Sequence, residues 1–426
     1  MKTLAPIAAL LISVAFLLAG HGLQLTIVPL RGQAEGWSSF ALGALGSAYY
    51  VGFVAGCLGA PLVIVRAGHI RAFAAFASLF AAVTLAHALF VGVAPWIAFR
   101  FVVGASLAGL YMIIESWLND RATNTNRGLL MSAYTVVNFA ALTVGELLAT
   151  LHPPRDFAHF AIAALAISLA VIPVALTRSA QPAPIRIVRF RPRALFRSSP
   201  VGVVGGTMIG IANGAFWTLG AVYAVGRGLD SSQAAIFLSC AVVGGALSQW
   251  PAGRLSDRID RRLVLIALLG AAALVGLLLA FLPIGGTSLF VLGFLFGVAT
   301  LPTYSIAAAH AYDHAQPGTY VETSAGILLA NGAGSIVGPL LASFVMGRTG
   351  TSNLFLFTAV AQALLAGFVY TRLKARAALP TAEKTEFDRS VTAPAGTVIP
   401  PESPQIGDLD VVAPRASSGD TPSATR

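Results

Sequence analysis

Twelve long apolar runs are the feature that most constrains this chain of 426 residues. A helix that crosses a membrane needs about 20 apolar residues, and each run is long enough. Because 56% of the residues are hydrophobic and only 10% are charged, a soluble domain would lack the polar surface it needs. The sequence therefore predicts an all-α membrane protein. Its spanning helices are expected at approximately residues 4–29, 39–62, 72–92, 94–118, 128–150, 157–177, 200–225, 233–252, 262–282, 286–308, 322–346 and 352–372.

Positive charge is distributed unevenly between the two ends of these helices. With the N-terminus inside, eighteen Lys and Arg residues before the tail fall on the cytoplasmic side and four fall on the other. This is the positive-inside bias of membrane proteins. We therefore expect a multi-pass protein of the cytoplasmic (inner) membrane with both termini in the cytoplasm. The net charge of +10 is explained by topology and lipid contact, so no nucleic-acid role is expected.

A polar, basic segment divides the apolar runs into two groups of six. Residues 178–199 contain six arginines and no acid, which is typical of a cytoplasmic linker. We expect a six-helix half at residues 1–177, a second at 200–376, and a disordered cytoplasmic tail at 377–426. An offset of 192 residues places Arg66 on Arg258, which predicts that the halves are diverged pseudo-repeats.

Several motifs resemble those of the major facilitator superfamily of transporters. Residues Gly253 to Arg262 lie between two apolar runs, as a short charged loop would, and resemble the G-x-L-x-D-R-x-x-R-R signature. Arg100 to Gly104 resembles the R-x-x-x-G motif, and Gly334 to Pro339 resembles the G-x-x-x-G-P motif associated with antiporters. The resemblance implies a major facilitator fold of two six-helix halves, with no enzymatic activity and no cofactor.

A further set of motifs resembles the YcaD-like branch of that superfamily. It comprises Trp96 to Phe101, Glu115 with Ser116, Asn126 to Gly128 with Tyr134, Gly145 to Leu148, and Gln249 to Pro251. Two positions depart from the patterns. Val65 stands where the second half has Asp257, and Glu146 replaces the glutamine usual in the branch.

Arg100 and Glu146 are the candidates for proton coupling, because an ionised side chain deep in a membrane is costly and is usually functional. Each lies about one turn inside the outer end of its helix, and helices 4 and 5 are expected to be antiparallel. We therefore predict an intramembrane ion pair that protonation of Glu146 would break. A static pair that only fixes helix packing is the alternative.

A charge latch is expected at the inner end of each half. Glu115 lies fifteen residues after Arg100, roughly 22 Å along the helix, so these two cannot pair. By analogy with the family, Glu115 would complete a gating latch with Arg66, Arg71 and Arg127. In the second half, Asp313 would act toward Arg258, within the set Gly253, Asp257, Arg258, Arg261 and Arg262. A plain topological role is the alternative.

Small residues in the motifs suggest close packing or bending. Gly253 would let its helix approach a neighbour closely. Gly334, Gly338 and Pro339 would allow helix bending, because proline removes a backbone hydrogen bond. Simple tight packing is the alternative for the same residues.

Polar and aromatic residues near the expected midplane are candidates for a substrate cavity between the halves. They are His21, Gln24, Tyr49, Tyr50, Asn138, Asn213, Trp217, Tyr304 and Asn331. Each could instead be an ordinary polar group between helices. The apolar surroundings favour an amphipathic or modestly polar substrate. His310, Asp313 and His314 are too few for a zinc site, so no metal is expected.

The leading functional prediction is a secondary active transporter that works by alternating access and exports a small molecule in exchange for protons. Uptake by symport or facilitated diffusion is the alternative within transport, and a non-transporting membrane sensor is the alternative of another class. The protein is expected to act as a monomer in the lipid bilayer.

Overall fold

The computed structural model describes residues 7–123, 126–177, 192–283, 285–316 and 319–375. Most of the predicted linker, at 178–191, and the predicted tail, at 377–426, lie outside these residues. Within them every regular element is a helix. The helices are α1 (Ala8–Ala34), α2 (Ser39–Ala67), α3 (His69–Leu89), α4 (Val93–Arg121), α5 (Arg127–Leu148), α6 (Ala158–Leu169), α7 (Val171–Ala175), α8 (Pro192–Ser198), α9 (Pro200–Gly226), α10 (Ser231–Arg258), α11 (Arg261–Phe281), α12 (Thr287–Thr300), α13 (Pro302–Asp313), α14 (Tyr320–Thr349) and α15 (Asn353–Ala375).

Twelve segments of the described chain are long and apolar enough to cross a membrane, which confirms the predicted number. Two of these spans are interrupted. The sixth consists of α6 and α7, and the tenth consists of α12 and α13. Pro173 and Pro302 lie just after the two interruptions. A proline lacks the backbone N–H and clashes with the preceding turn, so each breaks the regular helix there.

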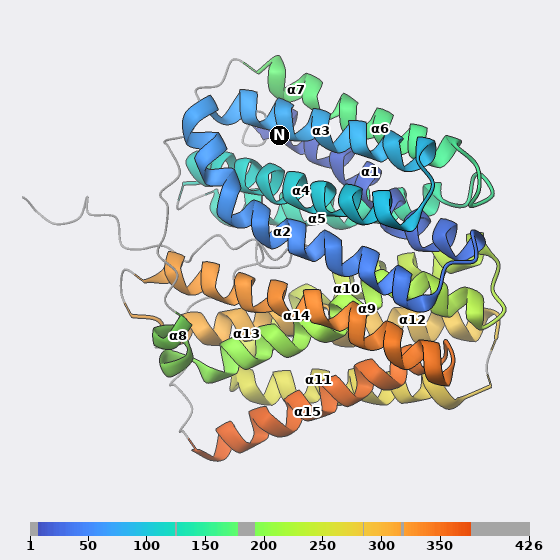
Figure 1. Ribbon diagram of the computed structural model, residues 1–426. Helices are drawn as coiled ribbons and strands as arrows, with labels where there is room; N and C mark the ends of the chain where they lie inside the picture. Colours follow the sequence, from blue (N-terminus) through green and yellow to red (C-terminus); the bar gives the residue numbers. More distant parts are fainter. Residues whose placement is uncertain (1–6, 124–125, 178–191, 284, 317–318, 376–426) are drawn as a thin grey trace, which may run out of the picture.

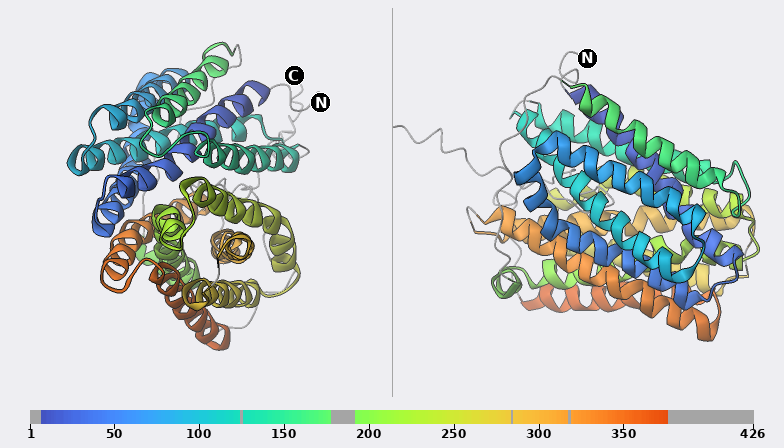
Figure 2. Two further views of the ribbon diagram at one scale, coloured as in Figure 1. Left: turned by 90° about the vertical axis from the view of Figure 1, so that its right-hand side faces the viewer. Right: turned by 45° about the horizontal axis from the view of Figure 1, so that its top comes forward.

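The helices form two bundles, α1–α7 and α9–α15, which lie side by side in Figure 1 and separate clearly in the end-on view of Figure 2. Equivalent helices of the two bundles begin at residues separated by a constant offset. Ser39 begins α2 and Ser231 begins α10, while His69 begins α3 and Arg261 begins α11, and each pair is 192 residues apart. The two six-helix pseudo-repeats of the predicted fold are therefore present.

Two closely packed helix pairs lie in the interior of each bundle, and glycines permit the close approach. A Cβ atom at Gly104 would overlap the carbonyl of Tyr49 in the α2–α4 pair, and one at Gly297 would overlap that of Ala241 in the α10–α12 pair. Gly145 lies against Ala19 between α1 and α5, as Gly338 lies against Ile211 between α9 and α14. Without an aqueous hydrophobic effect, such close backbone packing is a main source of helix association in lipid.

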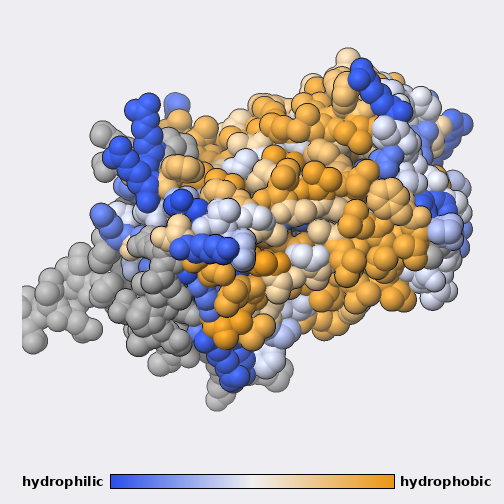
Figure 3. Space-filling model, turned by 90° about the horizontal axis from the view of Figure 1, so that it is seen from below, coloured by the Kyte–Doolittle hydropathy of each residue, from blue (hydrophilic) through white to orange (hydrophobic). Residues whose placement is uncertain are grey.

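The outer surface matches a membrane-embedded protein. A broad apolar band lies between hydrophilic residues at the two ends (Figure 3). We call the end with α8 and the C-terminus of α15 the linker end, and the end with residues 35–38 and 227–230 the far end.

The halves touch each other mainly through helices α2, α5, α9, α10 and α14. In the far half of the molecule, the Ser47 hydroxyl of α2 donates a 2.6 Å hydrogen bond to the Ile336 carbonyl of α14. At the far end itself, Gly43 packs against Ser343. The Ser232 hydroxyl of α10 donates to the Thr150 carbonyl just beyond α5 at 3.5 Å. The two bundles are thus joined at the far end.

Candidate substrate cavity and charged latches

A cavity lies between the halves, and the space there that no atom fills, open solvent included, is about 550 Å³. It is lined by His21, Tyr49 and Tyr50 of the first half, and by Trp217 and Asn331 of the second. The structure therefore brings five of the nine predicted cavity residues together. A neighbouring cavity of about 330 Å³ shares Tyr49, Tyr50 and Trp217 with it and reaches Arg100.

The other four predicted cavity residues lie outside the lining of these two cavities. Gln24 is fully buried and donates a 3.0 Å hydrogen bond to Thr84. Asn138 donates to the Tyr134 carbonyl of its own helix at 2.8 Å. Asn213 is half-buried on α9, and Tyr304 is buried on α13. These side chains act here as polar groups between or along helices.

The ion pair expected between Arg100 and Glu146 is not formed among the described residues. Instead, Nη1 of Arg100 lies 3.3 Å from Oε1 of Gln24, and the guanidinium lies 4.5 Å from the ring centroid of Tyr49. The sequence places the two charges at similar depth, but α4 packs against α2 and α3 while α5 packs against α1 and α10, so the two side chains meet different neighbours.

Glu146 points across the boundary between the halves. It is 1% exposed and faces Ser239 and Cys240 of α10. Neither carboxyl oxygen makes a hydrogen bond to a described residue, and the Ser239 hydroxyl is likewise unbonded. Leu142, one helical turn earlier on α5, lines the larger cavity. Glu146 thus lies between that cavity and the far-end contact of the halves.

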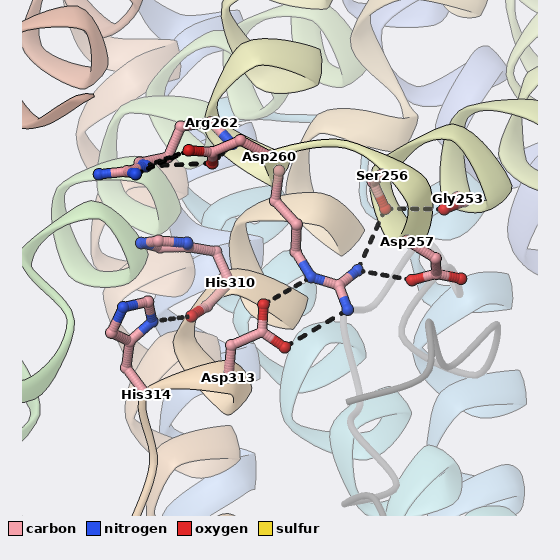
Figure 4. A network of polar contacts seen from close by, with 9 residues as sticks. Gly253, Ser256, Asp257, Asp260, Arg262, His310, Asp313 and His314 are labelled. Carbon is pink, nitrogen blue, oxygen red and sulfur yellow. Dashed lines mark hydrogen bonds and ion pairs between the residues drawn. The ribbon is translucent and has the colours of Figure 1, made fainter. Parts of the chain in front are cut away.

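The second-half latch is a packed ion network centred on Arg261 (Figure 4). The Arg261 side chain is 1% exposed and binds both oxygens of Asp313, at 2.7 and 3.4 Å. Its Nη1 also donates to Asp257 at 3.0 Å and to Ser256 at 3.1 Å. Ser256 in turn donates to the carbonyl of Gly253 at 2.7 Å.

Two details of that latch differ from the prediction. The segment from Gly253 to Arg258 is the last part of helix α10 rather than a loop, and only Ile259 and Asp260 separate α10 from α11. Asp313 pairs with Arg261 and not with Arg258, which is exposed and makes no ion pair with a described residue. Because the turn is so short, Arg261 begins α11 at a position from which its side chain reaches α13.

Arg262 forms a second ion pair beside the first. It binds Asp260 at 2.7 Å (Figure 4). It also donates to the Arg372 carbonyl of α15 at 3.1 Å. Burial alone would raise the pKa of the Asp260 carboxyl, but the hydrogen bonds and charge of Arg262 outweigh it. The pKa of Asp260 is therefore held below its usual value of 3.8.

Two of the four residues predicted for the first-half latch lie apart from any ion network of the described residues. Arg66 and Arg71 are exposed, and neither makes an ion pair with a described residue. Glu115 is buried in α4, within electrostatic range of Cys57 on α2 and Tyr304 on α13. It therefore lies deeper than the helix ends, while Arg127 begins α5 and is half-buried.

His69 occupies the place in the first half that Arg261 has in the second. Its side chain is buried and lies 3.0 Å from the Ser116 hydroxyl, with Asp120 within electrostatic range. Sequence reasoning missed these three residues. The offset of 192 that aligned Arg66 with Arg258 also aligns His69 with Arg261, and would have found them.

The glycines and proline of α14 lie in a continuous helix that contains Pro339. A Cβ at Gly334 would overlap the Thr207 carbonyl of α9, as one at Gly338 would overlap that of Ile211. Their evident role in this structure is close helix packing. Among the described residues, no group of three or more His, Cys, Asp or Glu side chains could hold a metal ion.

The geometry is that of a carrier: a central cavity between two bundles, with buried charges beside it and ion networks at a helix end. Comparison with known proteins agrees. The family model of the Major Facilitator Superfamily matches residues 10–321 and 202–406.

Curated relatives are uncharacterized MFS-type transporters named YcaD. That of Escherichia coli is 28% identical over 362 residues, covering 83% of this chain and 92% of the relative. That of Escherichia fergusonii is 27% identical over 361 residues, with the same coverage.

Solved structures show the same fold at low sequence identity. The crystal structure of the nucleoside transporter NupG superposes with a TM-score of 0.73 at 14% identity, covering 86% of this chain and 99% of that one. A bacterial homolog of the human lysosomal transporter Spinster superposes with a TM-score of 0.71 at 14% identity, covering 89% and 97%. The chain is a multi-pass membrane transporter that resembles the YcaD branch, and it belongs to the major facilitator superfamily.

Proposed function

We propose that this transporter exports a small molecule across the inner membrane in exchange for protons, with Glu146 as the proton-carrying group. The observation that carries the proposal is the burial of Glu146. Its two carboxyl oxygens have no hydrogen-bond partner among the described residues, and it lies between α5 and α10, where the halves meet. Burying an ionised carboxylate without a partner is costly, whereas a protonated carboxyl is tolerated much better.

The coupling follows from this difference. Protonation of Glu146 stabilises the state in which the far end is closed, because α5 and α10 then bury a neutral group. Loss of the proton favours separation of the two helices and hence opening of the far end. A proton can shift the equilibrium only by its different affinity for the two states.

The linker end is proposed to face the cytoplasm. The sequence predicts eighteen Lys and Arg residues on that side before the tail and four on the other, the bias expected for cytoplasmic segments. The joined far end then faces outward, and the cavity would receive substrate from the cytoplasm.

The pseudo-repeat supports antiport over the alternatives of symport and facilitated diffusion. Gly145 of α5 and Gly338 of α14 occupy matching helix contacts, 193 residues apart. In the G-x-x-x-G-P element of α14, proline follows that glycine, whereas Glu146 follows it in α5. The segment of α5 that matches this antiporter-like element of α14 thus carries a titratable group at the boundary between the halves.

Flux in proteoliposomes tests the proposal. Purified protein is first screened against metabolites and drugs by thermal shift, since a bound ligand stabilises the folded state. Hits are then assayed for flux with and without a pH gradient. The wild type should accumulate substrate against its gradient when a pH gradient is imposed. Glu146→Gln should exchange substrate but lose the pH-driven accumulation.

Two results would count against the proposal in different ways. Full pH-driven accumulation by Glu146→Gln would remove the proton role of that residue. Binding of a ligand without any flux would favour the sensor alternative. Accumulation in the same direction as the proton gradient would instead indicate symport and uptake.

A further inference from the structure

Arg100 is the most unusual charged group of the membrane interior. Its side chain is 5% exposed, and its Nε has no hydrogen-bond partner among the described residues. Its contacts are the amide oxygen of Gln24 and the ring of Tyr49, neither of which carries a negative charge. An arginine keeps its proton under all ordinary conditions, so a positive charge is buried here without an acid.

No acid of the described chain neutralises Arg100 in this structure. Glu115 lies on the same helix but about 22 Å away along its axis. Glu146 faces α10 and makes no ion pair. Removing a charge from water without a partner costs several kcal/mol, so the site favours any anion that can reach it.

The neighbours of Arg100 hold it in place. Gln24 donates through Nε2 to the Thr84 hydroxyl at 3.0 Å, and Thr84 donates to the Phe80 carbonyl at 2.8 Å. These two hydrogen bonds fix the Gln24 amide so that its Oε1 atom is directed at Arg100. The guanidinium is therefore positioned before any ligand arrives, which reduces the entropy lost on binding.

Arg100 also borders the open space between the halves. It borders the cavity of about 330 Å³ together with Tyr49, Tyr50 and Trp217. Those three residues also line the larger cavity of about 550 Å³, where His21 lies 3.5 Å from the Tyr49 hydroxyl. The arrangement offers a charged donor at one side and aromatic walls at the other.

We propose that Arg100 binds the carboxylate of an organic anion whose apolar body lies between Tyr50 and Trp217. The planar guanidinium matches a carboxylate through two parallel hydrogen bonds, and the aromatic rings supply apolar contact. The proposal rests on the proposed transport function, and it names the class of substrate as aromatic or aliphatic monocarboxylates.

The experiment uses three probes of one shape and different charge, namely indole-3-acetate, indole-3-acetamide and tryptamine. Binding to the purified full-length protein is measured by calorimetry at neutral pH. We expect the acetate to bind at least about tenfold more tightly than the acetamide, because a hydrogen bond to a charged group is the stronger. Tryptamine, a cation, should bind most weakly.

Two variants and a control assign the preference to Arg100. Arg100→Gln should bind acetate and acetamide equally. Gln24→Glu keeps Arg100 but supplies an acid beside it, and should also abolish the preference, so a misfolded Arg100→Gln would not end the test. Arg348→Gln removes an exposed arginine, which contacts the Phe344 ring, and should leave the preference unchanged.

Equal binding of the acetate and acetamide by the wild type would overturn the proposal. So would an undiminished preference in folded Arg100→Gln or Gln24→Glu. Flux in proteoliposomes separates this failure from failure of the transport proposal. Transport of other compounds without anion binding contradicts only the anion site, whereas anion binding without flux contradicts only transport.

Discussion

The two halves have a similar arrangement of helices, but their polar interactions lie at different depths in the membrane. In the second half, the linker end holds Arg261 between Asp313 and Asp257. At the equivalent joint in the first half, His69 lies against the Ser116 hydroxyl, with Asp120 more distant. A permanent charge with a bidentate carboxylate partner therefore occupies one joint, and a histidine–serine hydrogen bond occupies the other.

The middle of the membrane shows the opposite distribution. Gln24 of the first half lies in a polar network with Thr84 and Arg100. Phe216, 192 residues later, instead packs with Phe296 and Phe355, with ring centroids 5.1 and 6.1 Å away. The two halves therefore differ in where their charged side chains lie. The second half is fastened by charge at its end and packed with aromatic rings inside, whereas the first half presents its charge to the cavity.

Removing one member of the second-half network should have the largest effect. Asp313→Asn leaves Arg261 buried with half of its charge compensation gone, and we expect a loss of about 3–5 kcal/mol in unfolding free energy. Thermal unfolding in detergent measures the change. Arg258→Gln, at an exposed arginine three positions earlier, should change stability by less than about 0.5 kcal/mol. Equal melting temperatures for the two variants would show that the network does not fasten the half.

Glycine contacts should be equally important in both halves, because the close helix pairs recur in each. Gly104→Ala and Gly297→Ala should each cost about 1–3 kcal/mol by forcing a helix pair apart. Gly270→Ala is the matched control, since a Cβ there would meet nothing within 4 Å. A large loss at only one of the two packed positions would mean that one pair has room to adjust.

The first-half joint should be weaker than its counterpart. His69→Ala removes one hydrogen bond to Ser116, and we expect a loss of about 1 kcal/mol. Ser116→Ala should cost a similar amount, and the double variant should cost less than the sum, since both remove the same bond. If His69→Ala destabilised the protein as much as Asp313→Asn does, the proposed difference between the joints would be refuted.

Acid sensitivity of the Arg262–Asp260 pair should give the smallest effect. The pKa of Asp260 is lowered in the folded state, so its contribution is fully present above the usual value of 3.8. It is lost as the pH falls through the lower folded-state pKa. Melting temperatures measured from pH 5 downward should therefore fall less steeply for Asp260→Asn than for the wild type. Identical slopes would show that the Arg262 pair adds no acid-sensitive stability.

Some features of the fold could be predicted from the sequence for a clear physical reason. Runs of apolar residues determine the twelve spans, because backbone groups in lipid must be satisfied within a helix. The charged segment at Gly253 was misread as a loop, since polar residues mark the water boundary but do not end a helix. The actual turn is confined to Ile259 and Asp260.

The depth of Arg100 and Glu146 in the membrane could be predicted from the sequence, but the direction in which their side chains point could not. Residue counts placed Arg100 and Glu146 at similar depth, since each residue advances a helix by about 1.5 Å. Five cavity residues, including Tyr49 and Trp217, were identified because aromatic and polar groups are scarce at the midplane. The roles of Gln24 and His69 could not be assigned from composition, because both depend on a partner from another helix.

The sequence by itself determined the number of spans, the repeat of 192 residues and the asymmetry of charge. Tertiary structure alone decided which faces of the helices meet. Rotation of a helix about its axis leaves its apolar composition and its depth unchanged, but it selects the neighbours of every side chain. Close contacts between distant segments, such as Gly104 with Tyr49, bring particular helices together, so that Arg100 lies beside Gln24 and the cavity while Glu146 faces α10.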